Sequence, residues 1–305
     1  MTAAGTGAAP SPDYAAALGR LAHRDRVAGV LAISGTDRVA FLQGQLTQEV
    51  RGLEDGQARR AAGLTPKGKL LYFGWLVGIP ERLLLLVPFP RREAVLAHLS
   101  RYAVFQKVSL ADATAEFELL GLYGPAAREL VLPDGIVRLP AEAEMAAGAL
   151  VTTASRAALD RALAEAGSLP LSGEAAEALR VEAGRPRFGT DADESNLPDE
   201  VGLQSAISTT KGCYVGQEIV ARLRTYGRVS RRLVGFRFSG DVLSPGTVFS
   251  DPEKSGHELG RVTSSAMSPR FGPIGLGFAA RDVADGDALT GPGGATAVVG
   301  PLPFA

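Results

Sequence analysis

The sequence is poor in the residues from which redox and metal sites are usually built. Its 305 residues include one cysteine, Cys213, and three histidines. A single cysteine excludes a disulfide within the chain and a cysteine-rich zinc or iron–sulfur site made by this chain alone. The histidines, His23, His98 and His257, lie far apart in unrelated contexts, so no local pattern indicates a histidine metal site or a Ser-His-Asp triad. We expect no metal site, and a reducing, cytoplasmic location.

Neither sign of charge dominates, and no hydrophobic run is long. The 32 Lys+Arg balance 33 Asp+Glu, a net charge of −1, so bulk charge indicates no particular partner, and we do not expect a general nucleic-acid coat protein. The most apolar stretch, residues 70–90, is interrupted by Gly74, Gly78 and Pro80. No uninterrupted run within this stretch approaches the roughly 20 apolar residues of a spanning helix, so we expect no membrane segment. The first residues lack the pattern of a signal peptide, and we expect a flexible tail over residues 1–13.

The order of the patterns predicts an α+β fold. Residues 27–50 read as an apolar strand followed by an amphipathic helix, and β-rich runs from Ala61 indicate consecutive antiparallel strands, with GLTPKGK (63–69) as a hairpin turn. A helix over 91–101, a strand near 116, and alanine-rich helices capped by Ser155 and Ser172 follow. After Arg231 short runs alternate with Gly/Pro turns, as is typical of a small β-barrel. We expect two α+β lobes over 14–230 and a barrel over 231–305.

The sole cysteine lies in a distinctive segment, TKGCYVGQEIVARLRTYGR (210–228). Lys211 and Gly212 precede Cys213, and apolar residues at helical spacing follow it. The pattern places Cys213 at a helix N-terminus beside an ammonium group, and both features favour the reactive thiolate. The alternative is that Cys213 is a small buried hydrophobic residue.

Two charged clusters flank this segment. Asp191, Asp193, Glu194, Asp199 and Glu200 lie close together after two arginines. This cluster is either a solvated loop or a site for a ligand with adjacent N–H donors, such as the edge of a pterin, which one carboxylate can accept in bidentate fashion. The arginines near the end of the segment could hold carboxylates or phosphates, form a solvated helix face, or contact RNA; they are Arg222, Arg224, Arg228, Arg231 and Arg232.

The KGCYVGQE motif (211–218) resembles the signature of the YgfZ family, folate-binding proteins related to the aminomethyltransferase (T-protein) of the glycine cleavage system. The resemblance extends to the N-terminal strand–helix segment, the LTPKGKLL hairpin, the segment EAGRPRFGTDADESNLPDE and the C-terminal barrel. It implies a ring of three domains around a central channel that binds tetrahydrofolate. It also implies a role in assembling or maintaining iron–sulfur client proteins, including radical enzymes that modify tRNA.

The resemblance assigns roles to particular residues. Glu194 matches the glutamate that holds the pterin, and Phe188 matches an aromatic residue, usually tyrosine, in the same loop. Cys213 matches the family's cysteine, with Lys211 and Tyr214 in the same motif. We expect these three residues to carry the function, and Arg222 and Arg224 to assist folate binding.

One departure distinguishes the two branches of this family. T-proteins place a catalytic Asp after a buried strand, whereas the corresponding stretch here, LLLLVPFPRREAVL (83–96), contains only Glu93 as a carboxylate. General acid–base catalysis typically contributes about 10²–10⁴-fold to a rate. We therefore expect aminomethyl transfer to be absent, the alternative being a folate-dependent aminomethyl- or methyltransferase that uses another carboxylate such as Glu93. Direct tRNA binding through the arginine cluster is a third reading, which the near-zero net charge disfavours.

Overall fold

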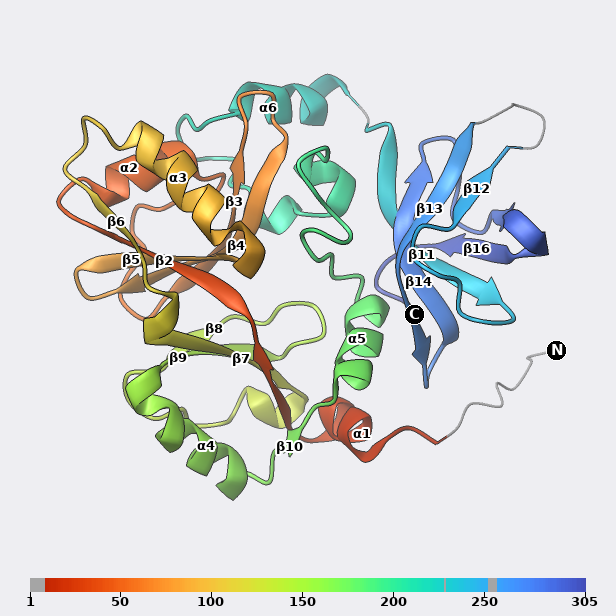
Figure 1. The fold of residues 1–305 in the computed structure, drawn as a ribbon, viewed down its shortest axis with the longest axis horizontal. Coiled ribbons are helices and arrows are strands. Elements are labelled where there is room, and N and C mark those ends of the chain that lie inside the picture. The colour runs from red at the N-terminus through yellow and green to blue at the C-terminus, as the bar shows by residue number, and fades with distance from the viewer. Residues whose placement is uncertain (1–8, 228, 252–256) are drawn as a thin grey trace.

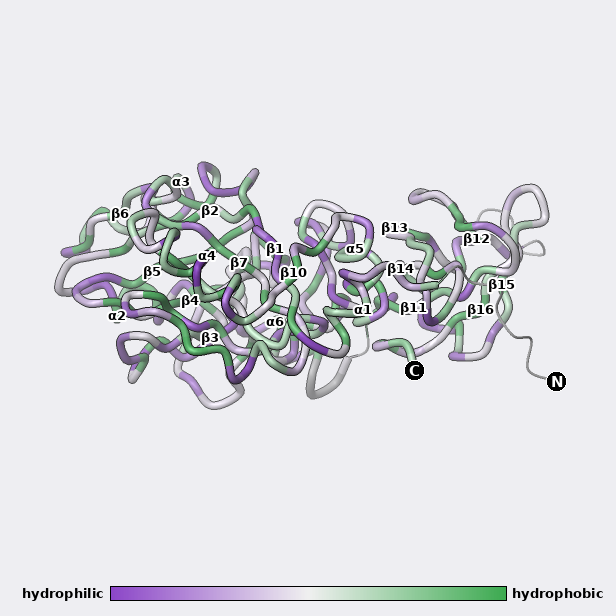
Figure 2. Tube along the Cα trace, turned by 90° about the horizontal axis from the view of Figure 1, so that it is seen from below, coloured by the Kyte–Doolittle hydropathy of each residue, from purple (hydrophilic) through white to green (hydrophobic). Residues whose placement is uncertain are grey.

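The computed structural model describes residues 9–227, 229–251 and 257–305, which form three β-sheets with flanking helices (Figure 1). The α+β class is confirmed, as is a small β-barrel at the C-terminal end. Seen from below, the barrel strands lie at one end of the molecule and the two other sheets at the other, with α1 (Pro12–Gly19) and α5 (Gly173–Glu182) between them (Figure 2). Within the described ranges, no helix is long and apolar enough to cross a membrane.

The first sheet is antiparallel and buried on both faces. Its strands, in spatial order, are β3 (Ala58–Leu64), β4 (Leu70–Ile79), β5 (Arg82–Pro88), β2 (Ala28–Ser34) and β6 (Ser109–Asp112). In β5, Leu83, Leu85 and Val87 pack under α2 (Arg38–Gln45) and α3 (Arg92–Tyr102), while Leu84 and Leu86 pack against the second sheet. Successive side chains of a strand alternate between its two faces. The run LLLLV is uninterrupted because both faces of β5 pack on apolar layers, the helices on one side and the second sheet on the other.

The second sheet packs on the first and carries α4 (Arg156–Glu165) on its other face. Its strands, in spatial order, are β10 (Leu169–Pro170), β1 (Ala22–Arg26), β7 (Phe117–Tyr123), β9 (Ala147–Thr152) and β8 (Val137–Leu139). The hydroxyl of Ser172 accepts from Ala175 N at 3.3 Å and so caps α5, as the sequence predicts. Ser155 precedes α4 without making such a bond. Helix α1 overlaps the end of the expected tail.

The third sheet curls into the barrel. Its antiparallel strands, in spatial order, are β12 (Val248–Ser250), β13 (Glu258–Ser268), β14 (Gly272–Ala280), β11 (Arg231–Ser239), β16 (Thr296–Gly300) and β15 (Ala288–Thr290). The two edge strands β12 and β15 contact each other, so the barrel is nearly closed. Phe236, Phe238 and Phe249 fill its interior, and α5 packs against the outside of β13.

Candidate functional site

A cavity of about 810 Å³ lies between the first two sheets, α5 and the loop that follows α5. Its aromatic wall comes from β4, the turn after β5, β7 and the loop, and its charged wall from β1, β3, the segment between β8 and β9, α5 and the loop. The aromatic residues are Phe73, Trp75, Phe89, Tyr123 and Phe188. The charged residues are Arg24, Asp25, Arg26, Arg60, Glu142, Glu177, Arg180, Arg185 and Arg187. A cavity lined by both aromatic rings and guanidinium groups suits a ligand that combines aromatic rings with anionic groups.

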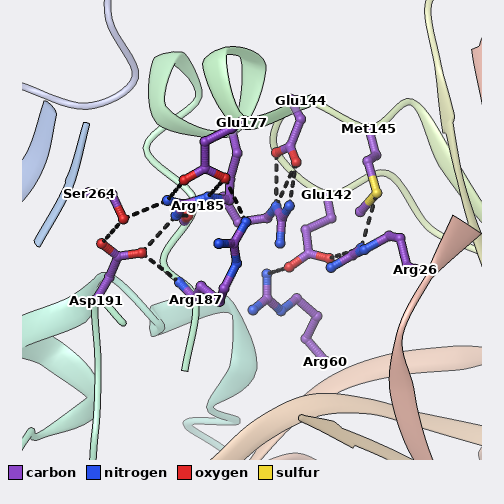
Figure 3. A network of polar contacts seen from close by, with 11 residues as sticks. Arg26, Arg60, Glu142, Glu144, Met145, Glu177, Arg185, Arg187, Asp191 and Ser264 are labelled. Atoms are coloured by element: carbon purple, nitrogen blue, oxygen red, sulfur yellow. Dashed lines mark hydrogen bonds and ion pairs between the residues drawn. The ribbon is translucent and has the colours of Figure 1, made fainter. Parts of the chain in front are cut away.

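The charged wall is an arginine–carboxylate network (Figure 3). Glu142 pairs with Arg60 and lies 3.8 Å from Nη1 of Arg26, while Arg185 binds Glu144 through Nε and Nη2, the shortest contact being 2.5 Å. Burial opposes the charge of Glu142, but Arg60, Arg185 and Arg26 outweigh it and hold the pKa of this carboxyl below its ordinary value. Glu142 is therefore ionised at neutral pH and cannot serve as a general acid.

Phe188 and Glu194 lie on the loop after α5 but occupy different environments. Phe188 is buried in the cavity wall, with its ring edge-on to Phe73 at 5.7 Å. Glu194 has a half-exposed side chain, is not among the cavity-lining residues of the described chain, and pairs with Arg91 at 2.5 Å. The Arg91 guanidinium also lies 5.5 Å from the centroid of the Phe188 ring. One arginine thus links the two residues that the resemblance assigns to a pterin.

The buried carboxylate of Asp191 fixes the conformation of this loop. Asp191 is 1% exposed and accepts hydrogen bonds from Arg180 Nη1 at 2.7 Å, Thr263 Oγ1 at 2.5 Å and Ser264 Oγ at 2.7 Å. It also accepts from the backbone N–H of Arg187 at 3.0 Å. These donors come from α5, β13 of the barrel and the loop itself, so one carboxylate joins three elements at the cavity. The acidic cluster is therefore only partly solvated: Asp191 and Glu200 are buried, whereas Asp193 and Glu194 are exposed.

The structure corrects the predicted surroundings of Cys213. Helix α6 (Gln217–Tyr226) begins after Gly216, so Cys213 precedes the helix instead of capping it, and it is exposed, which excludes the buried alternative. The Lys211 ammonium donates to the carbonyl oxygens of Gln43 at 2.7 Å, Leu46 at 2.5 Å and Gln48 at 3.0 Å. An ammonium has three N–H donors, so none remains for a thiolate. Burial lowers the pKa of Lys211 to about 8.

Lys211 thus anchors the motif to the first lobe. Its acceptors lie at the C-terminal end of α2, where backbone carbonyls lack helical partners and the helix dipole favours a cation. The buried Tyr214 ring lies 5.1 Å from the same ammonium. Gly216 adopts φ 82°, and a Cβ there would come within 2.6 Å of Thr65 O, so the predicted hairpin turn between β3 and β4 packs directly on the motif.

Of the remaining predicted residues, the described ones, Arg222 and Glu93, do not line the cavity. Arg222 is exposed on α6 and is not among the described residues that line the cavity. The side chain of Arg224 and all of Arg228 lie outside the part of the molecule that is described. The Glu93 side chain is 80% exposed and pairs with Arg92 at 3.0 Å. The structure therefore does not bring Glu93 to the cavity.

The charged wall of the cavity is not predicted by the sequence patterns. Arg26 and Arg60 lie on strands, and Glu142 lies in a short bridge with Met145. One feature of the sequence could have indicated this wall: in β3, Arg60 lies on the same face of the strand as the buried residues Ala62 and Leu64. A charge on a buried face needs partners, and those partners come from distant segments that the sequence does not pair.

The chain is similar in sequence to an aminomethyltransferase and to YgfZ proteins. The aminomethyltransferase of Rubrobacter xylanophilus is 31% identical to this chain, over 90% of this chain and 80% of its own length. The tRNA-modifying protein YgfZ of Yersinia enterocolitica is 32% identical, over 78% of this chain and 77% of its own. The solved aminomethyltransferase T of the glycine cleavage system from Bartonella henselae superposes with a TM-score of 0.81 over 96% of this chain and 88% of its own, at 21% identity. No model of a protein family matches the chain.

Proposed function

Because the chain belongs to the aminomethyltransferase-related family that includes YgfZ, we propose that it is a tetrahydrofolate-binding accessory protein for iron–sulfur proteins, including enzymes that modify tRNA. Cys213 is its functional thiol, and aminomethyl transfer is not its reaction. The observation that carries the proposal is the composition of the cavity, whose walls suit a folate and whose carboxylates, among the described lining residues, are all paired with arginines.

The cavity fits a folate in size and chemistry. Its volume of about 810 Å³ lies within the roughly 300–1,000 Å³ of small-molecule sites. The rings of Phe73, Trp75 and Phe188 offer flat apolar surfaces to a pterin and a benzoyl ring, and the arginines offer partners to carboxylates. Nε of Arg60 is buried without a hydrogen-bond partner in the described structure, as expected of a group whose acceptor belongs to a ligand. Bound tetrahydrofolate would supply a carrier for one-carbon groups.

The pterin position falls at Phe188 and Glu194. A pterin against Phe188 reaches Glu194 only if it shares or displaces Arg91. Half-exposed ion pairs are worth about 0.2–1 kcal/mol, which is small against the roughly 8 kcal/mol of micromolar binding. Phenylalanine in place of the family's usual tyrosine leaves the ring contact and removes a hydroxyl.

The wall at the end of β5 argues against transferase chemistry. Its cavity-lining residues, Leu86 to Pro90, carry no ionisable group. The carboxylates elsewhere in the wall are engaged: Glu142 with arginines, Glu177 with Arg180 and Arg187, and Asp25 with Arg156. For Glu142 and Glu177, the arginines outweigh burial and lower the pKa of the carboxyl, which makes these two groups poor proton donors. A binding function therefore suits the cavity better than a transferase function does.

The arginine cluster gives little support to direct tRNA binding. Arg231 lies 3.7 Å from Glu200, and Arg232 pairs with Asp285 at 2.7 Å. Arginines neutralised by nearby carboxylates contribute less to phosphate binding. We therefore place tRNA downstream, as the substrate of client enzymes.

Genetic rescue tests the proposal. In a bacterium that lacks its own YgfZ, this chain should restore the activity of iron–sulfur tRNA-modifying enzymes. Cys213→Ala should abolish rescue while leaving the unfolding curve and tetrahydrofolate affinity unchanged, because Cys213 is exposed and away from the cavity. Glu218→Ala, an exposed change in the same motif, is the control and should rescue normally. Full rescue by Cys213→Ala would remove the cysteine from the function.

A transfer assay separates the alternative. Mixed with tetrahydrofolate and the aminomethyl-lipoyl carrier protein of glycine cleavage, the purified chain should produce no methylene-tetrahydrofolate above background. Turnover that Glu93→Gln abolishes would establish the transferase reading instead.

A further inference from the structure

We propose that Arg26 and Arg60 form a carboxylate-binding subsite in the wall of the cavity, which takes the glutamyl tail of the folate. The inference deepens the proposed function and rests on it for the identity of the ligand. It depends on the balance of charge in the network that Figure 3 shows, on the unused donors of the two arginines, and on the position of Arg60 beside Trp75.

The network contains more positive than negative charge. Three guanidinium groups, those of Arg26, Arg60 and Arg185, converge on two carboxylates, Glu142 and Glu144. Arg185 is satisfied by its bidentate bond to Glu144. Glu142 alone therefore serves both Arg26 and Arg60, and one positive charge remains uncompensated in a partly buried wall. Such a charge attracts an anion from solution.

The hydrogen bonds of Arg26 and Arg60 show the same deficit. Nη1 of Arg26 donates to the thioether sulfur of Met145 at 3.1 Å, which is a weak acceptor, and lies 3.8 Å from Glu142. Arg60 donates to Glu142 through Nη1, but its Nε is buried and finds no acceptor among the described residues. Two guanidinium groups with unused donors on either side of one carboxylate are suited to a second carboxylate.

The surroundings select a carboxylate attached to an aromatic group. Arg60 lies 5.9 Å from the centroid of the Trp75 ring, and both residues line the cavity, as does Phe73. Asp25, the other nearby acid, pairs with Arg156 at 2.9 Å and its side chain is 67% exposed, so it does not compensate the charge of Arg26 and Arg60. A ligand whose rings lie on Trp75 and Phe73 brings its anionic end to Arg26 and Arg60.

Paired ligands test the subsite. Tetrahydrofolate and tetrahydropteroate share their rings, but only the first carries glutamyl carboxylates. By calorimetry the wild type should bind tetrahydrofolate at least tenfold more tightly. Arg26→Gln and Arg60→Gln should each remove most of that preference and leave tetrahydropteroate affinity unchanged. Arg24→Gln is the matched control, since Arg24 lines the same cavity but donates to the carbonyl of Leu171 at 2.7 Å, and it should keep the preference.

A second measurement does not depend on the folding of variants or on a pterin. Trp75 is the sole tryptophan, so its fluorescence should change when wild-type protein is titrated with glutarate, a free dicarboxylate. Inorganic phosphate should be at least tenfold weaker. Equal effects of phosphate and glutarate would overturn the assignment to carboxylates.

The outcomes separate the subsite from the function on which it rests. Equal wild-type affinity for the two pterins would overturn the subsite and leave folate binding intact. Binding of glutarate without either pterin would support the subsite and refute the folate assignment. No response to any of these ligands from folded protein would refute both.

Discussion

Removing the Asp191 carboxylate should destabilise the protein more than any change of an exposed acid in the same loop. Asp191→Ala leaves Arg180, a side chain only 1% exposed, without one of its two carboxylate partners. It also removes the carboxylate to which the hydroxyls of Thr263 and Ser264 in the barrel donate. Breaking a buried ion pair by deleting one partner typically costs about 3–5 kcal/mol. Because Glu177 still holds Arg180 at 2.7 Å, we expect the lower end, about 3 kcal/mol.

Urea denaturation measures this loss, with Trp75 fluorescence and far-ultraviolet circular dichroism as the two probes. Asp193→Ala is the control, because it removes the same charge from an exposed position that accepts one backbone N–H, from Ser195 at 2.7 Å. It should cost about 1 kcal/mol or less. Equal destabilisation by the two substitutions would refute the view that Asp191 locks the loop to α5 and the barrel.

Three further predictions concern pH, backbone packing and the motif lysine. Burial lowers the pKa of His23 in the folded protein, so below about pH 6.5 this residue binds a proton more readily in the unfolded chain. The free energy of unfolding of the wild type should therefore decrease as the pH falls through that range. A pH series of urea midpoints should show a shallower loss for His23→Gln, and parallel curves would contradict this assignment. Gly74→Ala should lower the free energy of unfolding by about 1–3 kcal/mol, because the added Cβ would lie 1.9 Å from Leu86 O. Gly44→Ala, in open space on α2, should raise it by about 0.5–1 kcal/mol. A higher melting temperature for Gly74→Ala than for Gly44→Ala would contradict this account of the packing. Lys211→Met should lower the free energy of unfolding by about 1–3 kcal/mol, because it leaves three carbonyls without a donor. Lys67→Met, at an exposed position in the hairpin turn, should change it by less than about 0.5 kcal/mol. Indistinguishable urea curves for the two variants would show that Lys211 does not anchor the motif.

The sequence predicts the local architecture well where one pattern dominates. The strand and helix over 27–50 appear as β2 and α2, the helix over 91–101 appears as α3, and the turn at 63–69 joins β3 to β4. Apolar periodicity and Gly/Pro turns are local signals, and each element follows from its own residues. The barrel after Arg231 follows from regularly spaced short runs in the same way.

The site is harder to predict because it depends on contacts between distant segments. Lys211 precedes Cys213 by two residues, which suggests a thiolate partner, yet its ammonium binds carbonyls about 165 residues earlier in the chain. The wall formed by Arg26, Arg60 and Glu142 joins three separate segments, and no pairing among them is visible in the sequence. Phe188 lines the cavity, and the contact between Glu194 and Arg91 emerges only from the fold.

Calorimetric titration with tetrahydrofolate tests the central claim most directly. The wild type should bind one equivalent, and Glu194→Ala should weaken binding at least tenfold, which corresponds to about 1.4 kcal/mol. Glu218→Ala, which removes an exposed carboxylate from α6, should leave the affinity unchanged. Absence of binding by folded wild-type protein would contradict the account.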